Sequence, residues 1–155
     1  MTRINVIPVE DLADQHLMAE YRELPMVNAS LRRSFASKKG FNKNRIPEEY
    51  TLNSGHVTFF YDKGLFLYNR YNQLIQELRR RKYDIDPDSR TVDWTVFKQG
   101  YWNDWTPTNR NKYINVERIV IRLLEKPTFY NYNKIKIDES FASELKEKYL
   151  GLLLD

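Results

Sequence analysis

The sequence of 155 residues contains no cysteine. Disulfides, thiolate metal sites and cysteine nucleophiles are therefore excluded. Histidine is scarce as well, because only His16 and His56 could supply an imidazole ligand. We therefore expect no metal centre and no bound cofactor, although carboxylates alone remain available to a metal-dependent nuclease.

Long apolar runs are also missing. Those at residues 57–61 and 119–124 are far shorter than the ~20 residues that a membrane-spanning helix needs. No signal peptide is visible at the start of the chain. The sequence therefore predicts a protein with no membrane partner, and we expect it in the cytoplasm.

Positive charge is in modest excess, with 25 Lys and Arg against 21 Asp and Glu and a formal net charge of +4. Such a balance favours polyanionic partners where the charges cluster. Arg118 and Arg122, four residues apart, point the same way from a predicted helix. The basic run at residues 79–82 suits either phosphate binding or the end of a helix, where cations complement the helix dipole.

Apolar residues recur at helical spacing in three places, which predicts helices at about residues 10–35, 64–82 and 109–126. Pro25 lies inside the first of them and lacks a backbone donor, so we predict a kink or break near Leu24. Pro127 marks the end of the third. A shorter amphipathic helix that packs back on the domain is expected after Asp138.

The connections between these helices are long. Residues 38–54 are polar and show no period, which is typical of a surface loop, whereas residues 55–63 are predicted to be extended. Residues 84–108 are irregular and aromatic and should cover the core. The expected fold is mainly α, a compact single domain over residues 1–155 with three main helices, long irregular connections and a C-terminal helical extension over residues 138–155.

Reactive groups gather near the amino end. His16 and Glu23 fall on one face of the first predicted helix, while Gln15 and Arg22 occupy the neighbouring stripe. If the chain start folds back on this surface, Thr2 comes close to Glu23. A terminal α-amine has a pKa near ~7.7–8.0, so a useful fraction is neutral and nucleophilic. It can attack C1′ of a deoxyribose, with the carboxylate stabilising an oxocarbenium-like centre and moving protons.

Three blocks of sequence carry a family resemblance, and they follow one another in the expected order. They are residues 1–5 (MTRIN) with 12–25 (LADQHLMAEYRELP), residues 55–63 (GHVTFFYDK), and residues 127–130 (PTFY) with Tyr132. In these blocks the chain resembles the pyrimidine-dimer DNA glycosylase/AP-lyase family of T-even-type bacteriophages, also called phage endonuclease V. The first block is the most specific of the three.

The resemblance implies that the amino terminus lies between helices, that Thr2 forms an imine once Met1 is removed, and that Glu23 is the catalytic carboxylate. It implies double-stranded DNA with UV lesions or abasic sites as the partner, and we expect a monomer in the cytoplasm of a bacterial host. The DNA-facing residues implied by the resemblance are Arg3, Gln15, His16, Tyr21, Arg22, Arg118, Arg122, Phe129, Tyr130 and Tyr132.

The chain also departs from the family pattern. Met26 stands where a family member has arginine, Phe129 where tryptophan is expected, and Asn131 in place of a lysine. The choice of lesion can differ as a result. Three alternatives stay open: a glycosylase or lyase for other damaged bases or abasic sites only, a non-catalytic basic DNA-binding module, and a nuclease that binds a metal through carboxylates.

Overall fold

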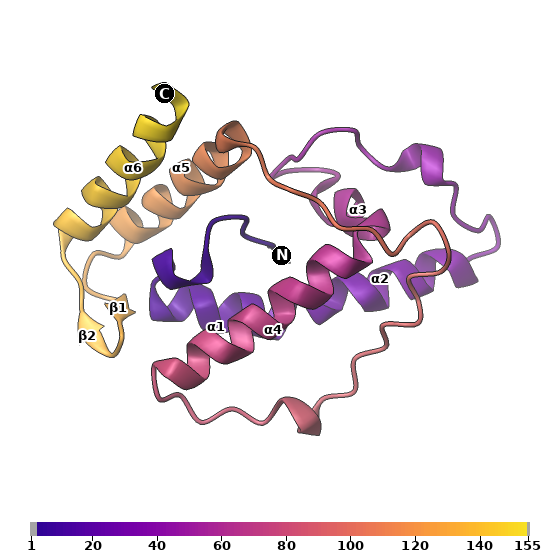
Figure 1. Cartoon of the computed structure of the whole chain (residues 1–155), viewed down its shortest axis with the longest axis horizontal. Helices are drawn as coiled ribbons and strands as arrows, with labels where there is room; N and C mark the ends of the chain where they lie inside the picture. The colour runs from indigo at the N-terminus through magenta and orange to yellow at the C-terminus, as the bar shows by residue number, and fades with distance from the viewer. Residues whose placement is uncertain (1–2, 155) are drawn as a thin grey trace.

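The computed structural model describes residues 3–154, and its fold is mainly α, as predicted (Figure 1). Within these described residues, the β-structure is one small antiparallel hairpin of β1 (Asn131–Tyr132) and β2 (Ile135–Lys136). The helices are α1 (Asp14–Glu23), α2 (Pro25–Ala36), α3 (His56–Phe59), α4 (Gly64–Arg80), α5 (Asn109–Glu125) and α6 (Glu139–Leu154). Among these helices, none is long and apolar enough to span a membrane.

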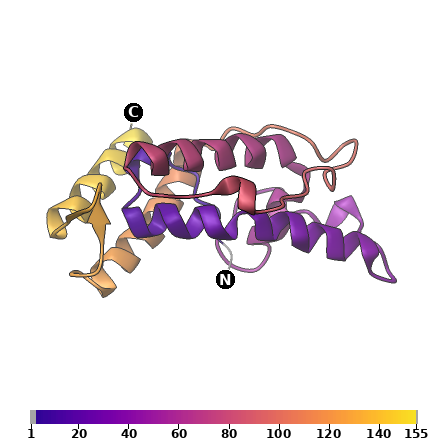
Figure 2. The same cartoon turned by 90° about the horizontal axis from the view of Figure 1, so that it is seen from below.

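The first predicted helix is two helices that meet at Leu24, and Figure 2 shows α1 and α2 as one bent rod. Pro25 occupies the start of α2, where its missing N–H would have no partner within the helix. Leu24 is fully buried, and its carbonyl accepts a hydrogen bond from the Val27 N–H at 3.0 Å. The predicted break is thus confirmed, and it leaves Glu23 at the end of α1, next to the bend.

The prediction of an extended segment at residues 55–63 is wrong. Gly55, with φ of 90°, precedes α3, and a 3₁₀ turn over Phe60–Asp62 follows. A positive φ is easy for glycine and strained for other residues. His56, Phe59 and Phe60 are all buried, so the segment packs on more than one side. The aromatic and β-branched composition that favours strands did not decide the structure, because strand propensity depends on the tertiary setting.

The second and third predicted helices are confirmed as α4 and α5. Thr108 and Asn111 close the start of α5 with a capping box, in which each side chain accepts a hydrogen bond from the other's backbone N–H. The helical spacing of Tyr113, Val116, Val120 and Leu124 predicts an apolar stripe on α5, and this stripe is correct as far as Val120. At its end Leu124 is 52% exposed, while Leu123 is buried instead.

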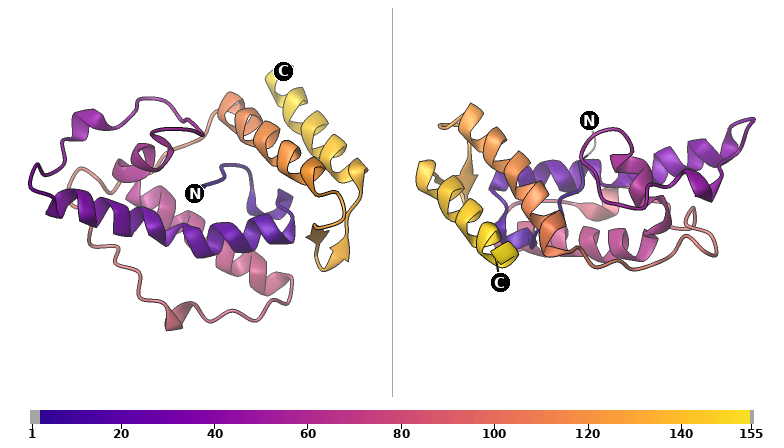
Figure 3. Two further views of the ribbon diagram at one scale, coloured as in Figure 1. Left: turned by 180° about the vertical axis from the view of Figure 1, so that it is seen from behind. Right: turned by 90° about the horizontal axis from the view of Figure 1, so that it is seen from above.

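The chain after residue 138 forms α6, which lies alongside α5 in both views of Figure 3. Leu145 and Tyr149 face the domain and are buried, as the predicted amphipathic pattern requires. The Tyr149 hydroxyl donates to the Asp11 carboxylate, which also pairs with Lys148 at 2.9 Å. The C-terminal helix is therefore fastened to the segment that precedes α1.

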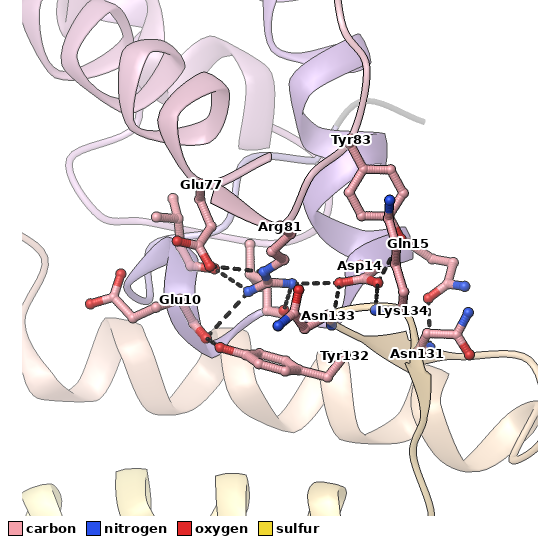
Figure 4. Close-up of polar contacts among 12 residues, drawn as sticks. Glu10, Asp14, Gln15, Glu77, Arg81, Tyr83, Asn131, Tyr132, Asn133 and Lys134 are labelled. Atoms are coloured by element: carbon pink, nitrogen blue, oxygen red, sulfur yellow. Dashed lines mark hydrogen bonds and ion pairs between the residues drawn. The ribbon is translucent and has the colours of Figure 1, made fainter. Parts of the chain in front are cut away.

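The basic run at residues 79–82 divides between surface and interior, and Figure 4 shows its interior member, Arg81, between Glu77 and Asp14. Arg81 is fully buried and donates to the carboxylates of Glu77 and Asp14, each at 2.8 Å. It also donates to the Leu12 carbonyl at 2.7 Å. Arg81 is therefore a structural tie between α4 and the chain around α1, which removes it from any DNA-binding footprint of this run.

Candidate active site

The amino-terminal segment, residues 3–8, runs between α4 and α5 and pairs with neither β1 nor β2 (Figure 1). Two of its backbone N–H groups donate to side chains from distant parts of the chain. The Ile4 N–H donates to Nε2 of His56 at 2.8 Å, and the Val6 N–H donates to Oδ1 of Asn115 at 2.8 Å. Ile4 and Asn115 are completely buried. These contacts hold the chain in place up to Arg3.

The side chain of Asn5 fixes the same segment from the other direction. It donates to Oε1 of Glu20 at 2.9 Å and accepts from the amide of Asn115 at 2.8 Å. Arg70 closes the network, because it donates to both carboxylate oxygens of Glu20, at 2.7 and 3.0 Å, and to the Ile7 carbonyl. A buried network with all members satisfied stiffens its surroundings. The amino-terminal segment is thus a rigid part of the core.

His56 acts here as a neutral imidazole. Burial, assisted by the nearby charge of Arg3, lowers the pKa of His56 to about 4. Its Nδ1 lies 2.7 Å from the Thr51 carbonyl, which can only accept, so the proton sits on Nδ1. The lone pair on Nε2 is then free to accept from the Ile4 N–H. A doubly protonated ring would break this second bond.

Beside the anchored segment lies a pocket of about 350 Å³ between α1 and α5. Two larger cavities, of about 650 and 700 Å³, lie elsewhere, but the smaller one holds the chemistry predicted from the sequence. The predicted site residues that line it are Arg3, His16, Glu23, Arg118, Arg122 and Tyr130. A pocket of this size suits a small group such as a nucleobase or a sugar.

Positive charge dominates the pocket. Burial and the neighbouring charges of Arg118 and Arg122 lower the pKa of Arg3, while Glu23 acts in the opposite direction. Glu20 also lines the wall, but its two oxygens are occupied by the network described above. The Glu23 carboxylate accepts no hydrogen bond within residues 3–154. One uncommitted carboxylate thus faces three guanidinium groups.

His16 and Tyr130 form the aromatic part of the wall, with ring centroids 4.8 Å apart. Burial, and then the charge of Arg122, lower the pKa of His16 to about 4, so the ring is neutral near pH 7. Its buried Nδ1 has no hydrogen-bond partner in the described part of the chain. An unsatisfied buried nitrogen in a pocket is a candidate contact for a bound ligand.

Other predicted site residues lie outside this pocket. Tyr21 is buried and stacks on Tyr71 at 5.6 Å, with the guanidinium of Arg90 4.9 Å from its ring. Arg90 also donates to the carbonyls of Tyr21 and Arg22, at 2.9 and 2.8 Å. The Arg22 side chain is exposed beside Glu23. Tyr21 therefore supports the end of α1, whereas Arg22 is open to solvent.

The segment that follows α5 is held against α1 by Gln15. The Gln15 amide donates to the Phe129 carbonyl at 3.2 Å, and its oxygen accepts from the Asn131 N–H at 2.9 Å. The Tyr132 hydroxyl donates to the Glu10 carbonyl at 2.6 Å (Figure 4). Phe129 itself is 52% exposed. The structure thus engages Gln15 and Tyr132 in internal bonds and leaves Phe129 at the surface.

Thr2 lies outside the described residues, so the structure does not test the expected position of its amine. The residues that sequence reasoning missed are those that anchor the chain just after it, above all Asn115 and His56. Within residues 3–154, no group of three or more His, Asp or Glu side chains is arranged to hold a metal ion.

Residues 1–91 match the model of one protein family, whose description is pyrimidine dimer DNA glycosylase. The match covers more than half of the chain. It includes the amino-terminal segment, α1 with Glu23, and the chain through α4. The part of the pocket that α5 contributes, with Arg118 and Arg122, lies beyond the matched residues.

Proposed function

Because this chain belongs to the pyrimidine dimer DNA glycosylase family, we propose that it works through an imine and then cuts the DNA strand as an AP lyase. Its place in DNA repair, its activity as a DNA glycosylase and its binding of DNA follow from the family. The proposal concerns the nucleophile, the second reaction and the residues that carry them.

One observation carries this proposal: an uncommitted Glu23 carboxylate faces Arg3 across a pocket suited in size to a nucleotide group. Arg3 directly follows Thr2, and adjacent Cα atoms in a trans-linked chain are ~3.8 Å apart. A mature chain that begins at Thr2 would therefore carry its α-amine within about one residue of the pocket wall. The network around Asn5 limits how far that amine could move.

The charges of the pocket favour a neutral amine. Arg3, Arg118 and Arg122 repel a further positive charge nearby, which opposes protonation of the nucleophile. The neutral nitrogen attacks C1′, and the bond from C1′ to the base breaks, with the base leaving as it gains a proton. The negative charge of Glu23 stabilises the oxocarbenium-like centre that develops at C1′.

The same nitrogen then allows strand cleavage. Opening of the sugar ring breaks the bond between C1′ and O4′, O4′ gains a proton, and an iminium ion remains. The iminium acidifies the C2′ proton, and its removal expels the 3′ phosphate by β-elimination. Glu23 can move protons in both steps. Water finally hydrolyses the imine, which frees the amine and releases an aldehyde on the sugar fragment.

The remaining side chains are proposed to hold the DNA. Arg118 and Arg122 bind backbone phosphates, which fix the register of the duplex. His16 and Tyr130 form the wall that receives an extruded base or its sugar, with Nδ1 of His16 open to a hydrogen bond. Phe129, at the surface, contacts the duplex from outside. All pocket residues come from one chain, and we propose that the enzyme acts as a monomer.

Borohydride trapping tests the imine, because reduction makes it a stable covalent link. We expect adducts on a duplex with an abasic site and on one with a pyrimidine dimer, both unaffected by EDTA. The adduct should map to Thr2, in a protein whose mass lacks Met1. Glu23→Gln should reduce strand cutting strongly, whereas Glu147→Gln, an exposed change of the same type on α6, should not.

Three results would overturn parts of the proposal. If DNA binds in a salt-dependent way but is never trapped, the chain is a binding module and the imine is wrong. Trapping on abasic DNA without cutting at a dimer would restrict the activity to abasic sites. Loss of cutting in EDTA would point to a metal-dependent nuclease instead.

A further inference from the structure

A second groove, of about 700 Å³, lies between α2, the loop that follows it and α3. In the left view of Figure 3, this loop and the amino-terminal segment lie on the same side of the rod formed by α1 and α2. None of the described residues that line the groove is acidic. Its cationic and hydroxyl-bearing residues include Arg33, Arg45, Ser34, Ser54, Thr58 and Tyr61.

The two arginines of the groove are uncommitted. Arg33 and Arg45 are exposed, and their guanidinium groups form no ion pair or hydrogen bond within residues 3–154. By contrast, the buried Arg70 and Arg81 are fully engaged with carboxylates and carbonyls. Free guanidinium groups beside several hydroxyl donors form a setting that matches the oxygens of a phosphate.

The groove and the catalytic pocket are linked through residues 53–56. Ser54 and Gly55 line the groove, while the preceding residue, Asn53, accepts a hydrogen bond from Arg118 of the pocket at 3.4 Å. The following residue, His56, holds the amino-terminal segment through Ile4. One short stretch of chain therefore has the pocket on one side and the groove on the other.

Helix geometry gives the separation of the two sites. From Glu23 to Arg33 the α1–α2 rod advances by ~15 Å at ~1.5 Å per residue. B-form DNA advances ~3.4 Å per base pair, so this distance corresponds to about four base pairs. A duplex that lies along α2 with its damaged nucleotide at the pocket would bring flanking phosphates to the groove.

We propose that this groove is a second binding site for the phosphodiester backbone, about four base pairs from the damaged nucleotide. Arg33 and Arg45 each bind one phosphate there, and the hydroxyl groups of Ser54 and Thr58 donate to the same oxygens. The inference rests on the proposed function, because it assigns the flanking part of the same substrate. The groove adds affinity and fixes the register of the duplex, and it takes no part in the chemistry.

Salt dependence of binding provides the first test. The variant Arg33→Ala/Arg45→Ala is compared with wild type on an abasic duplex with about one helical turn of DNA on each side. Loss of two phosphate contacts should reduce the slope of log K against log salt concentration by about 1.8. The value of KM should rise while kcat stays unchanged. Arg110→Ala/Lys146→Ala removes the same charge from exposed positions on α5 and α6 that line neither site, and it should keep the wild-type slope.

Duplex length provides the second test. Two further duplexes each retain only ~3 base pairs on one side of the lesion, short of the separation estimated above. One of the two duplexes lacks the side of the lesion that reaches the groove, so the groove has no phosphate to hold there. On that duplex, wild type and Arg33→Ala/Arg45→Ala should bind with equal affinity. The inference would be overturned if Arg33→Ala/Arg45→Ala bound every duplex more weakly than wild type by the same factor, or if its salt slope equalled that of wild type.

Two controls keep these results separate from other causes. Arg33→Lys/Arg45→Lys retains the two positive charges, so it should keep the wild-type salt slope and the wild-type thermal midpoint. A reduced salt slope in this lysine variant would contradict simple phosphate binding. Borohydride trapping by wild type is measured on the same duplexes. Absence of trapping would refute the proposed function, whereas normal trapping with an unchanged slope in Arg33→Ala/Arg45→Ala would refute only the groove.

Discussion

Replacing Asn115 should loosen the chain start and slow the chemistry more than it weakens DNA binding. Asn115 is fully buried, accepts from the Val6 N–H and donates to Asn5, each at 2.8 Å. In Asn115→Ala, both partners are left buried and unpaired, at ~1–3 kcal/mol each. We therefore expect the free energy of unfolding to fall by about 2–4 kcal/mol, towards the lower part of the summed range because the segment can partly detach and reach water.

The functional effect of Asn115→Ala follows from geometry. A displacement of about 1 Å at a reacting group can slow a reaction ~100-fold, whereas Arg118 and Arg122 remain on α5 to bind phosphates. Single-turnover borohydride trapping should therefore slow by tenfold or more, roughly, with little change in the affinity for abasic DNA. Urea unfolding measures the stability, and Glu117→Ala, an exposed change on the same helix, is the control. Wild-type stability and trapping in Asn115→Ala would refute the idea that this residue positions the chain start.

Three further predictions concern other parts of the molecule. The folded-state pKa of His56 lies near 4, below its unfolded value of about 6.5, so its contribution to stability is present above pH 6.5 and is lost as pH falls towards 4. This contribution of His56 to the free energy of unfolding amounts to at most ~3 kcal/mol. In His56→Gln, the stability measured by urea unfolding should therefore fall less steeply between pH 6.5 and pH 4 than in wild type. If the two proteins lose stability in parallel over this range, the assignment to His56 is wrong. Arg81→Met removes the buried cation between Asp14 and Glu77, although Tyr83 still donates to Asp14 and Arg80 still pairs with Glu77. It should destabilise the fold by ~3 kcal/mol, the lower end of the range for a broken buried ion pair, with no change in the salt slope of DNA binding; a smaller slope would restore Arg81 as a phosphate contact. Phe129→Ala, at a surface position, should change the free energy of unfolding by less than ~0.5 kcal/mol yet weaken DNA binding in a titration, and unchanged affinity would remove Phe129 from the interface.

Helices α4 and α5 and the break at Leu24 could be predicted because their signals are local. A repeat of apolar residues every three or four positions and a proline act over a few neighbouring residues. The prediction failed where several neighbours compete. Residues 55–63 are packed on more than one side, so a composition typical of strands could not reveal a helical turn. At the end of α5, Leu123 is buried in place of Leu124, next to the helix pair α5–α6.

For the candidate site, the sequence by itself determined the chemical groups: a carboxylate at Glu23, arginines spaced to share helix faces, and no thiol. Only the tertiary structure decided which polar groups remain open to a ligand. Asn115 precedes Arg118 by three residues on α5, yet its amide oxygen accepts from the N–H of Val6, 109 positions away in the sequence. Arg81 likewise meets Asp14 across 67 positions. Partners at such separations leave no trace in local spacing, because they meet only when the helices pack.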